Sequence, residues 1–239
     1  MIPLKKALNS SIGKKYIMGV TGLSLVGFLF SHLYGNLFLY WPESTGFNGY
    51  TDALHSWGGW LTAAEFGLAA LFVIHIAMAF WLQTDKTRAK GRYAESRKTK
   101  GGPSHMTIFS RNMFWTGFVL FGFLIVHVLQ FRFGPGVDAG YTTTIGQNAE
   151  ARDLFRLVVE TFQDPVWVVI YMVVMLFLGL HVRHGFWSAL QSLGAMKPEW
   201  SKAIYAVGAA VALIFVLGFM FIPPWLYFDG GQYLGIGRL

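Results

Sequence analysis

The order of apolar and polar residues along the chain predicts five membrane-spanning helices. Each is an apolar segment about as long as a bilayer requires, bounded by charged or turn-forming residues. The segments cover residues 16–40, 57–82, 110–131, 165–190 and 202–226. The first is too long for a removed signal peptide and lacks its small-residue cleavage pattern. No internal repeat is evident, and we expect one all-α transmembrane domain over residues 1–239, with the first four helices forming a four-helix bundle.

The distribution of Lys and Arg sets the direction of the helices in the membrane. Basic residues flank one set of helix ends, namely Lys5, Lys6, Lys14, Lys15, Lys86, Arg88, Lys90, Arg92, Arg97, Lys98, Lys100, Lys197 and Lys202. The opposite ends are acidic, with Glu43, Asp52, Asp138, Glu150, Asp153, Glu160, Asp164 and Asp229. This predicts a multi-pass protein of the cell (cytoplasmic or inner) membrane with its N-terminus in the cytoplasm. Topology also accounts for the net charge of +7 without a nucleic-acid partner.

Two loops carry further signals. The basic loop 83–110 is a topology signal, a contact with anionic lipid or a docking surface for a cytoplasmic partner. In the outer loop 132–164, the stretch NAEARDLFRLVVETFQ predicts an amphipathic helix on the membrane surface. Asp164 and Pro165 fit the cap and first position of the fourth membrane helix.

Composition restricts the chemistry that this chain can carry. Only 13% of its 239 residues are charged, against about 25% in a typical soluble domain. There are no cysteines, which excludes disulfides, iron–sulfur ligation and covalently attached c-type haem. Any redox group held by this chain must therefore use histidine or methionine.

Histidines interrupt four of the apolar segments, one in each of the first four. An ionisable group inside a membrane is costly and usually faces the bundle interior with a partner. His32 and His127 lie 17 and 16 residues past the inner residues Lys15 and Arg111, roughly 25 Å deep at 1.5 Å per residue. By the same count from the outer ends, His75 and His181 lie toward the inner side. The four histidines thus form two pairs in two planes.

Two pairs at two depths predict bis-histidine ligation of two haems, each iron taking one imidazole from each of two facing helices. Gly35, Gly122, Gly179 and Gly185 near the ligands leave space for a flat macrocycle, although close helix packing explains each glycine equally well. His184 is a rival for the fourth ligand, but its depth matches His75 less well. His184 and Arg183 are then candidates for contacts with haem propionates or a neighbouring subunit, or simply reach the inner headgroups.

The chain resembles the cytochrome b membrane-anchor subunit of succinate:quinone oxidoreductases and fumarate reductases, of the five-helix dihaem type. The resemblance is carried by SSIGKKYIMGVTGL at 10–23, FSHLYGNL at 30–37, HVRHGFWSALQSLG at 181–194 and the order of the four histidines. It implies that His32 and His127 bind an outer haem b and that His75 and His181 bind an inner haem b. It also implies a flavoprotein partner with FAD, an iron–sulfur partner, and electron transfer to a membrane quinone, either menaquinone or ubiquinone. The dicarboxylate chemistry would then belong to the flavoprotein.

The sequence offers few candidate residues for a quinone site. Glu65 is the only carboxylate inside a predicted span, and we expect it to exchange protons at an outer quinone site. Alternatively, the Glu65 carboxylate is hydrogen-bonded within the bundle or open to water on the outer side. Weaker candidates are Asp52 and His55 outside, and Ser11, Lys14 and Arg111 inside. In some relatives a glutamate precedes the fourth ligand and helps move protons, but here Leu178, Gly179 and Leu180 stand there.

Two other functions fit part of the pattern. A dihaem, quinone-linked cytochrome of a hydrogenase or formate dehydrogenase also pairs histidines in a small helical anchor. A transporter or proton channel would use the histidines as a relay, but it predicts more intramembrane carboxylates and helices broken by Gly or Pro.

Overall fold

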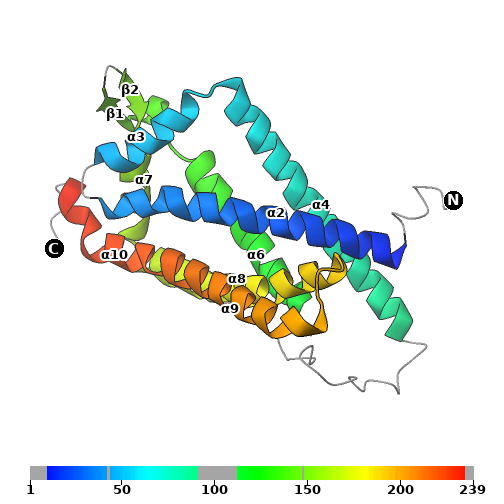
Figure 1. The fold of residues 1–239 in the computed structure, drawn as a ribbon. Coiled ribbons are helices and arrows are strands. Elements are labelled where there is room, and N and C mark those ends of the chain that lie inside the picture. The colour runs from blue at the N-terminus through cyan, green and yellow to red at the C-terminus, as the bar shows by residue number, and fades with distance from the viewer. Residues whose placement is uncertain (1–9, 42–43, 91–111, 147, 235–239) are drawn as a thin grey trace. The chain divides into compact units, whose positions relative to one another are not determined.

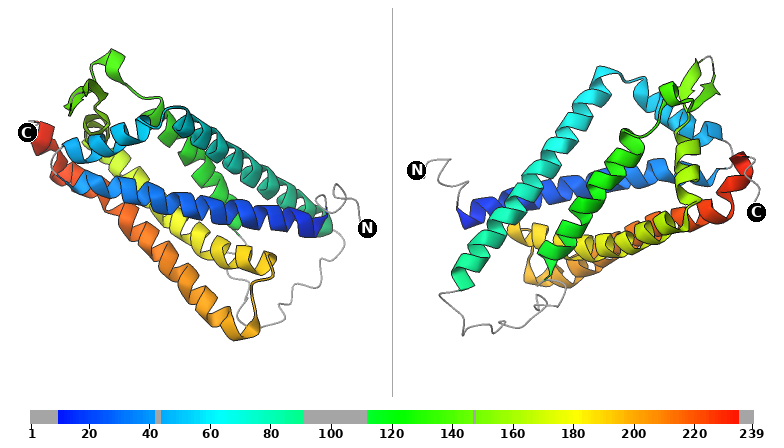
Figure 2. Two further views of the ribbon diagram at one scale, coloured as in Figure 1. Left: turned by 45° about the horizontal axis from the view of Figure 1, so that its top comes forward. Right: turned by 180° about the vertical axis from the view of Figure 1, so that it is seen from behind.

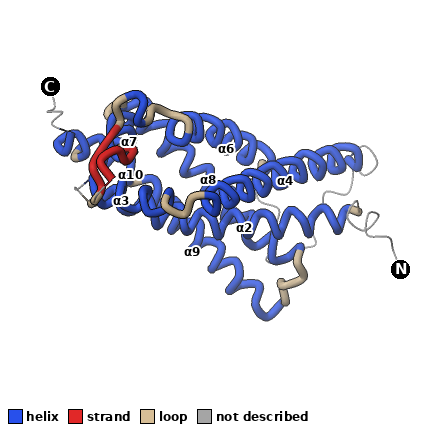
Figure 3. The backbone as a smooth tube through the Cα atoms, turned by 90° about the horizontal axis from the view of Figure 1, so that it is seen from above, coloured by secondary structure: helices blue, strands red, loops and turns tan. Residues whose placement is uncertain are grey.

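Five long helices dominate the computed structural model, which describes residues 10–41, 44–90, 112–146 and 148–234 (Figure 1). They are α2 (Ser11–Leu37), α4 (Gly59–Lys90), α6 (Met113–His127), α8 (Pro165–Ser192) and α9 (Ser201–Met220). With their short continuations, all five are long and apolar enough to cross a membrane. The predicted all-α membrane protein with five spans is thus confirmed. Within the described residues, strands occur only in one two-stranded hairpin, coloured red in Figure 3.

The long helices extend beyond the apolar segments that predicted them. α2 begins at Ser11 rather than residue 16, and α4 continues to Lys90 rather than ending at residue 82. Polar side chains continue a helix once it leaves the bilayer, and an apolar window does not register them. The ion pair between Lys14 Nζ and Asp85 Oδ2, 2.7 Å long, joins these two polar extensions. The predicted start of α8 is confirmed, since the Val166 N–H donates to the Asp164 carboxylate at 2.9 Å.

Short elements connect the long helices. They are η1 (Phe38–Tyr40), α3 (Ser44–His55), a π-helical turn η2 (Val128–Arg132), η3 (Val137–Ala139), β1 (Thr142–Ile145), β2 (Asn148–Arg152), α7 (Leu154–Phe162), η4 (Pro198–Trp200), α10 (Ile222–Phe228) and η5 (Gly230–Leu234). α3, the hairpin, α7 and α10 lie together in both views of Figure 2, and α7 contacts α3 and α10.

The predicted surface helix at residues 148–163 is wrong in two respects. Its first five residues form strand β2, and the helix begins only at Leu154, after the N-cap residue Asp153. Its apolar face is also covered by protein, because Phe155 and Val159 are fully buried. The amphipathic pattern is real, but the apolar stripe packs against neighbouring helices instead of lipid.

Contacts divide the chain into two compact units, and each unit takes one stretch of every long helix. Unit 1 comprises residues 1–28, 66–118 and 180–213, and unit 2 comprises residues 29–65, 119–179 and 214–239. In unit 1 the first four long helices form a ring of contacts. Thr21 meets His75, Phe80 meets Phe114, Thr116 meets His181, and the backbone at Gly19 approaches Ala189. These contacts join α2 to α4, α4 to α6, α6 to α8 and α8 to α2, as in a four-helix bundle.

Unit 2 contains a buried apolar cluster of ten residues. Its members are Leu39, Phe47, Phe155, Val158, Val159, Phe162, Val168, Tyr171, Ile222 and Leu226. They come from η1, α3, α7, α8 and α10, so this cluster joins the short elements to the ends of the long helices. Each large apolar side chain contributes about 1.5–3 kcal/mol when fully buried.

A fully buried amide, Asn48, ties α3 to the start of α7. Its Nδ2 donates to Asp153 Oδ1 at 2.7 Å, and its Oδ1 accepts the Phe155 N–H at 2.9 Å. Asp153 in turn accepts the Arg156 N–H at 3.0 Å and caps α7. The buried Phe155 N–H therefore depends on this side chain for its hydrogen bond.

We expect Asn48→Ala to lower the free energy of unfolding by about 1–3 kcal/mol, because it leaves a buried N–H without a partner. Thermal unfolding in detergent measures the change. Gln191→Ala, which removes an exposed amide, is the matched control and should have no effect. Equal midpoints for the two variants would contradict this role for Asn48.

Candidate functional site

The structure brings the inner pair of histidines together within unit 1. His75 on α4 and His181 on α8 have ring centres 6.5 Å apart, with an angle of 68° between the ring planes. Each imidazole also meets a threonine hydroxyl from a neighbouring helix. His75 Nδ1 lies 3.2 Å from Thr21 Oγ1 on α2, and His181 Nδ1 lies 3.1 Å from Thr116 Oγ1 on α6.

A glycine follows each of these threonines and lies against the same imidazole. A Cβ atom at Gly22 would be 3.3 Å from His75 Cε1, and one at Gly117 would be 3.2 Å from His181 Cε1. Both distances are tighter than most real Cβ contacts, so any larger side chain would push the ring. The absence of a side chain thus lets each ring lie directly against a helix backbone.

The outer pair lies within unit 2. His32 on α2 and His127 at the end of α6 have ring centres 5.8 Å apart, and their planes are nearly perpendicular at 88°. His127 Nδ1 is 3.3 Å from the Tyr171 hydroxyl, which donates to Gln130 Oε1 at 2.7 Å. Tyr171 is itself part of the buried cluster, so His127 is held by a tyrosine in a fixed position.

His32 has different surroundings from its partner. Its ring lies 5.7 Å from that of Phe219 on α9, and its Nε2 is 3.4 Å from Asn36 Nδ2. Asn36 also donates to the His32 carbonyl at 2.8 Å, one helical turn back. The two histidines of the outer pair are thus held by unlike groups, whereas those of the inner pair are held by like groups.

The ring separation in each pair can be compared with that of two imidazoles bound to one metal. Two imidazoles that bind one metal from opposite sides, with bonds of about 2 Å, have ring centres roughly 6 Å apart. The separations of 5.8 and 6.5 Å are close to that value. No group of three or more His, Asp or Glu side chains that could hold a metal ion occurs among the described residues.

Glu65 forms an ion pair that the sequence did not reveal. Both of its oxygens accept hydrogen bonds from Arg132, at 2.9 Å from Nε and 3.0 Å from Nη2. Arg132 ends the π-helical turn that follows His127, and the same turn carries Gln130. π-Helical turns are frequent at functional sites. A ligand at Glu65 would have to share this carboxylate with Arg132, and the predicted proton exchange stays a prediction.

His184 lies three residues after His181 on α8 and interacts with it electrostatically, whereas the other predicted site residues have their own contacts. His184 contacts Trp187 on its own helix, with ring centres 4.7 Å apart, and Arg183 is exposed. His55 Nδ1 donates to the Thr51 carbonyl at 2.7 Å. Asp52 lies on the same helix, α3. Their proposed contacts with propionates or quinone stay predictions.

Among the candidates for the predicted inner side, Lys14 is buried, paired with Asp85 and 4.9 Å from the centre of the Trp81 ring. Ser11 is exposed at the start of α2. Arg111 and most of the basic loop, residues 91–111, lie outside the described residues, as do Lys5, Lys6 and Glu43.

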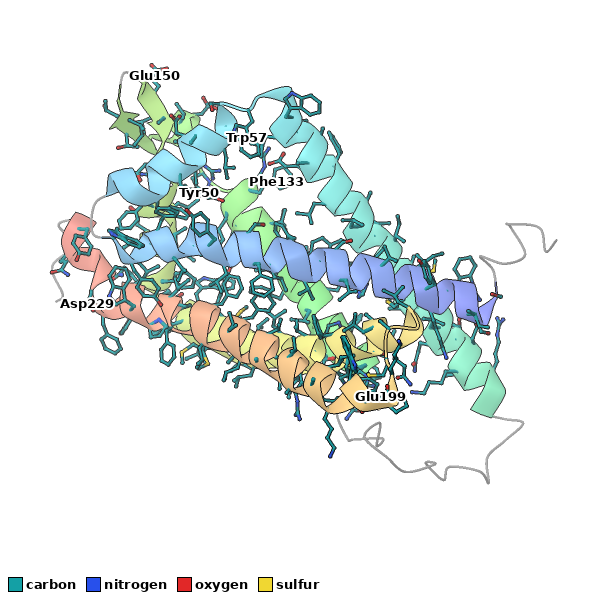
Figure 4. All side chains as sticks on the ribbon, in the orientation of Figure 1. Tyr50, Trp57, Phe133, Glu150, Glu199 and Asp229 are labelled. Atoms are coloured by element: carbon teal, nitrogen blue, oxygen red, sulfur yellow. The ribbon has the colours of Figure 1, made fainter. Side chains whose placement is uncertain are left out.

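The glycines that were expected to leave room for a macrocycle differ from one another. At Gly35 a Cβ would come within 2.6 Å of the Tyr50 ring, so this glycine allows the close approach of α3, where Tyr50 lies between α3 and α2 (Figure 4). At Gly122 and Gly185 a Cβ would meet no atom within 4 Å. Gly179 is buried. Gly35 therefore serves packing, whereas Gly122 and Gly185 have open space beside them.

Sequence reasoning missed the two threonine–glycine pairs, and an internal repeat could have found them. Residues 18–32 and 113–127 share the pattern M-x-x-T-G-x-x-L-x-G-F-L-x-x-H, identical at eight of fifteen positions. Residues 75–81 and 181–187 share H-x-x-x-x-F-W. The expectation of no internal repeat is wrong: α2 and α4 correspond to α6 and α8. In this correspondence His32 matches His127 and His75 matches His181, which are the same two pairs.

No protein-family model matches the chain, and neither a curated protein nor a solved structure does.

Proposed function

We propose that the chain is a dihaem cytochrome b that anchors a succinate:quinone oxidoreductase or fumarate reductase in the cell membrane. In that role it passes electrons between an iron–sulfur subunit and a membrane quinone. The observation that carries the proposal is the pair of facing imidazole couples, at ring separations of 5.8 and 6.5 Å, on four apolar helices. An iron held by two histidines exchanges one electron and keeps no coordination position open for a substrate.

Four histidines of this chain would hold the two haems. His32 and His127 would hold the outer haem, and His75 and His181 the inner haem. Threonine hydroxyls fix the inner imidazoles, and Tyr171 fixes His127. Such outer contacts orient ligand rings and raise their basicity. The four helices that carry these histidines are apolar.

The choice of partner enzyme rests on the resemblance in sequence alone. One ligand on each of four successive spans and the SSIGKK segment favour a succinate or fumarate enzyme over a hydrogenase or formate dehydrogenase. FAD and the iron–sulfur clusters would then lie in partner subunits on the cytoplasmic side, and Glu65 with Arg132 would be the place to look for an outer quinone site.

A reduction experiment on the complex, purified with its partners, tests this function. We expect succinate to reduce the b-type haems, and a menaquinol or ubiquinol analogue to reduce them also without the partners. Haems that respond to hydrogen or formate instead would assign the chain to the alternative enzyme class. A chain that contains no haem would favour a histidine-based transporter.

A further inference from the structure

We propose that Thr21 and Thr116 are matched positioning residues for the inner histidine pair, one from each half of the internal repeat. Each accepts the Nδ1–H of one imidazole and thereby leaves its Nε2 free to ligate iron. The inference rests on the proposed haem function, and it concerns only residues of unit 1.

The surroundings of each threonine hydroxyl show to which group it donates its proton. A threonine hydroxyl has one proton to donate. Thr21 Oγ1 lies 2.8 Å from the Ile17 carbonyl, and Thr116 Oγ1 lies 3.0 Å from the Met113 carbonyl. A carbonyl only accepts, so each hydroxyl donates to its own helix backbone. Its oxygen must then accept from the imidazole.

The tautomer of each histidine follows from this assignment. Because Thr21 and Thr116 accept, His75 and His181 carry their protons on Nδ1. A neutral imidazole protonated at Nδ1 has its lone pair on Nε2. Both inner histidines are thereby prepared to bind a metal through Nε2, before any metal is present. A metal-bound histidine commonly donates its other N–H in this way.

Gly22 and Gly117 restrict the position of the two imidazole rings. Gly22 and Gly117 each follow the accepting threonine, and a Cβ at either would come within 3.3 Å of the Cε1 atom of the same ring. Cε1 lies between the two ring nitrogens. The imidazole is therefore fixed on one side by the hydroxyl and on the adjacent side by bare backbone.

Because of the internal repeat, His75 and His181 have the same Thr-Gly surroundings. In each half, the Thr-Gly pair stands on the first helix and its histidine on the second, and the contact distances agree to 0.1 Å. In the outer pair the contacts are of different kinds, since His127 meets Tyr171 and His32 meets Asn36. We therefore expect the two inner ligands to be equivalent and the two outer ligands to differ.

Potentiometry of the purified full chain in a His32→Ala background, which keeps only the inner haem, tests the proposal. Loss of the Nδ1–H acceptor makes the imidazole less basic and favours ferrous over ferric iron. We expect Thr116→Val and Thr21→Val each to raise the midpoint potential, by about 59 mV for every tenfold change in the ferric-to-ferrous binding ratio. The ferric EPR signal, which depends on the angle between the imidazole planes, should change as well.

Rescue and control variants separate positioning from simple packing. Thr116→Ser and Thr21→Ser keep the hydroxyl and should retain the wild-type potential. Ser24→Ala removes an α2 hydroxyl that donates to the Val20 carbonyl and is exposed, and it should change nothing. A shift of equal size in the Ser and Val variants would overturn the proposal, as would unchanged potentials in both Val variants. If the wild-type chain binds no haem, the proposed function itself fails.

Discussion

We expect His75→Ala to remove the inner haem and leave the outer one, and His32→Ala to do the reverse. Each substitution deletes one of two proposed iron ligands and leaves the other pair intact, because the pairs lie in different compact units. Reduced-minus-oxidised spectra with haem quantification should therefore give half of the wild-type haem for either variant. The residual haems should differ in potential, since one has two threonine-held ligands and the other a tyrosine-held ligand.

His184→Ala is the matched control for this experiment. His184 lies on the same helix as His181 and contacts Trp187, so its loss should leave both haems bound. If His184→Ala removed the inner haem while His181→Ala did not, the ligand assignment on α8 would be wrong. Loss of both haems from each of His32→Ala and His75→Ala would contradict two independent sites.

Gly22→Val and Gly117→Val should also remove the inner haem selectively. The added Cβ would lie 3.3 and 3.2 Å from the ring carbons of His75 and His181, and the two further methyl groups need still more space. The imidazole must therefore move away from its hydroxyl and from the partner ring. Because disturbed contacts around a metal ligand cost about 10- to 100-fold in affinity, we expect at least a tenfold loss of inner-haem binding, measured by titrating haem into the apoprotein.

Gly67→Ala provides the comparison for these two glycine variants. Gly67 is exposed on α4, and a Cβ there would meet no atom within 4 Å. Alanine is also the better helix former. This variant should bind both haems as the wild type does, and equal losses in Gly67→Ala and Gly117→Val would show that the effect is not local to the imidazole.

The number and place of the long helices could be predicted because bilayer thickness forces a long apolar segment in each. The same signal does not register polar turns, so the ends at Ser11 and Lys90 were missed. It also cannot distinguish an apolar stripe that faces lipid from one that faces protein. The helix α7 has such a stripe, and its burial depends on α3 and α10, which are far away in sequence.

The two histidine pairs could be predicted because depth along a helix follows directly from residue count. Their surroundings could not, since Thr21 and Thr116 are uncharged and carry no signal alone. Comparison of the two halves of the chain, rather than of single segments, brings out these threonines. Arg132 was missed for another reason: its pairing with Glu65 depends on a π-helical turn, for which the residues Val128–Arg132 give no simple sequence sign.

Haem quantification on the purified full-length chain is the most direct test of the central claim that each histidine pair holds one iron. The account predicts two b-type haems per chain, both low-spin in the ferric state, as expected for irons with two imidazole ligands. One haem per chain would mean that one of the two pairs serves another purpose. A chain that takes up no haem, even when haem is supplied during expression, would contradict the account and return all four histidines to a role in proton or metal transport.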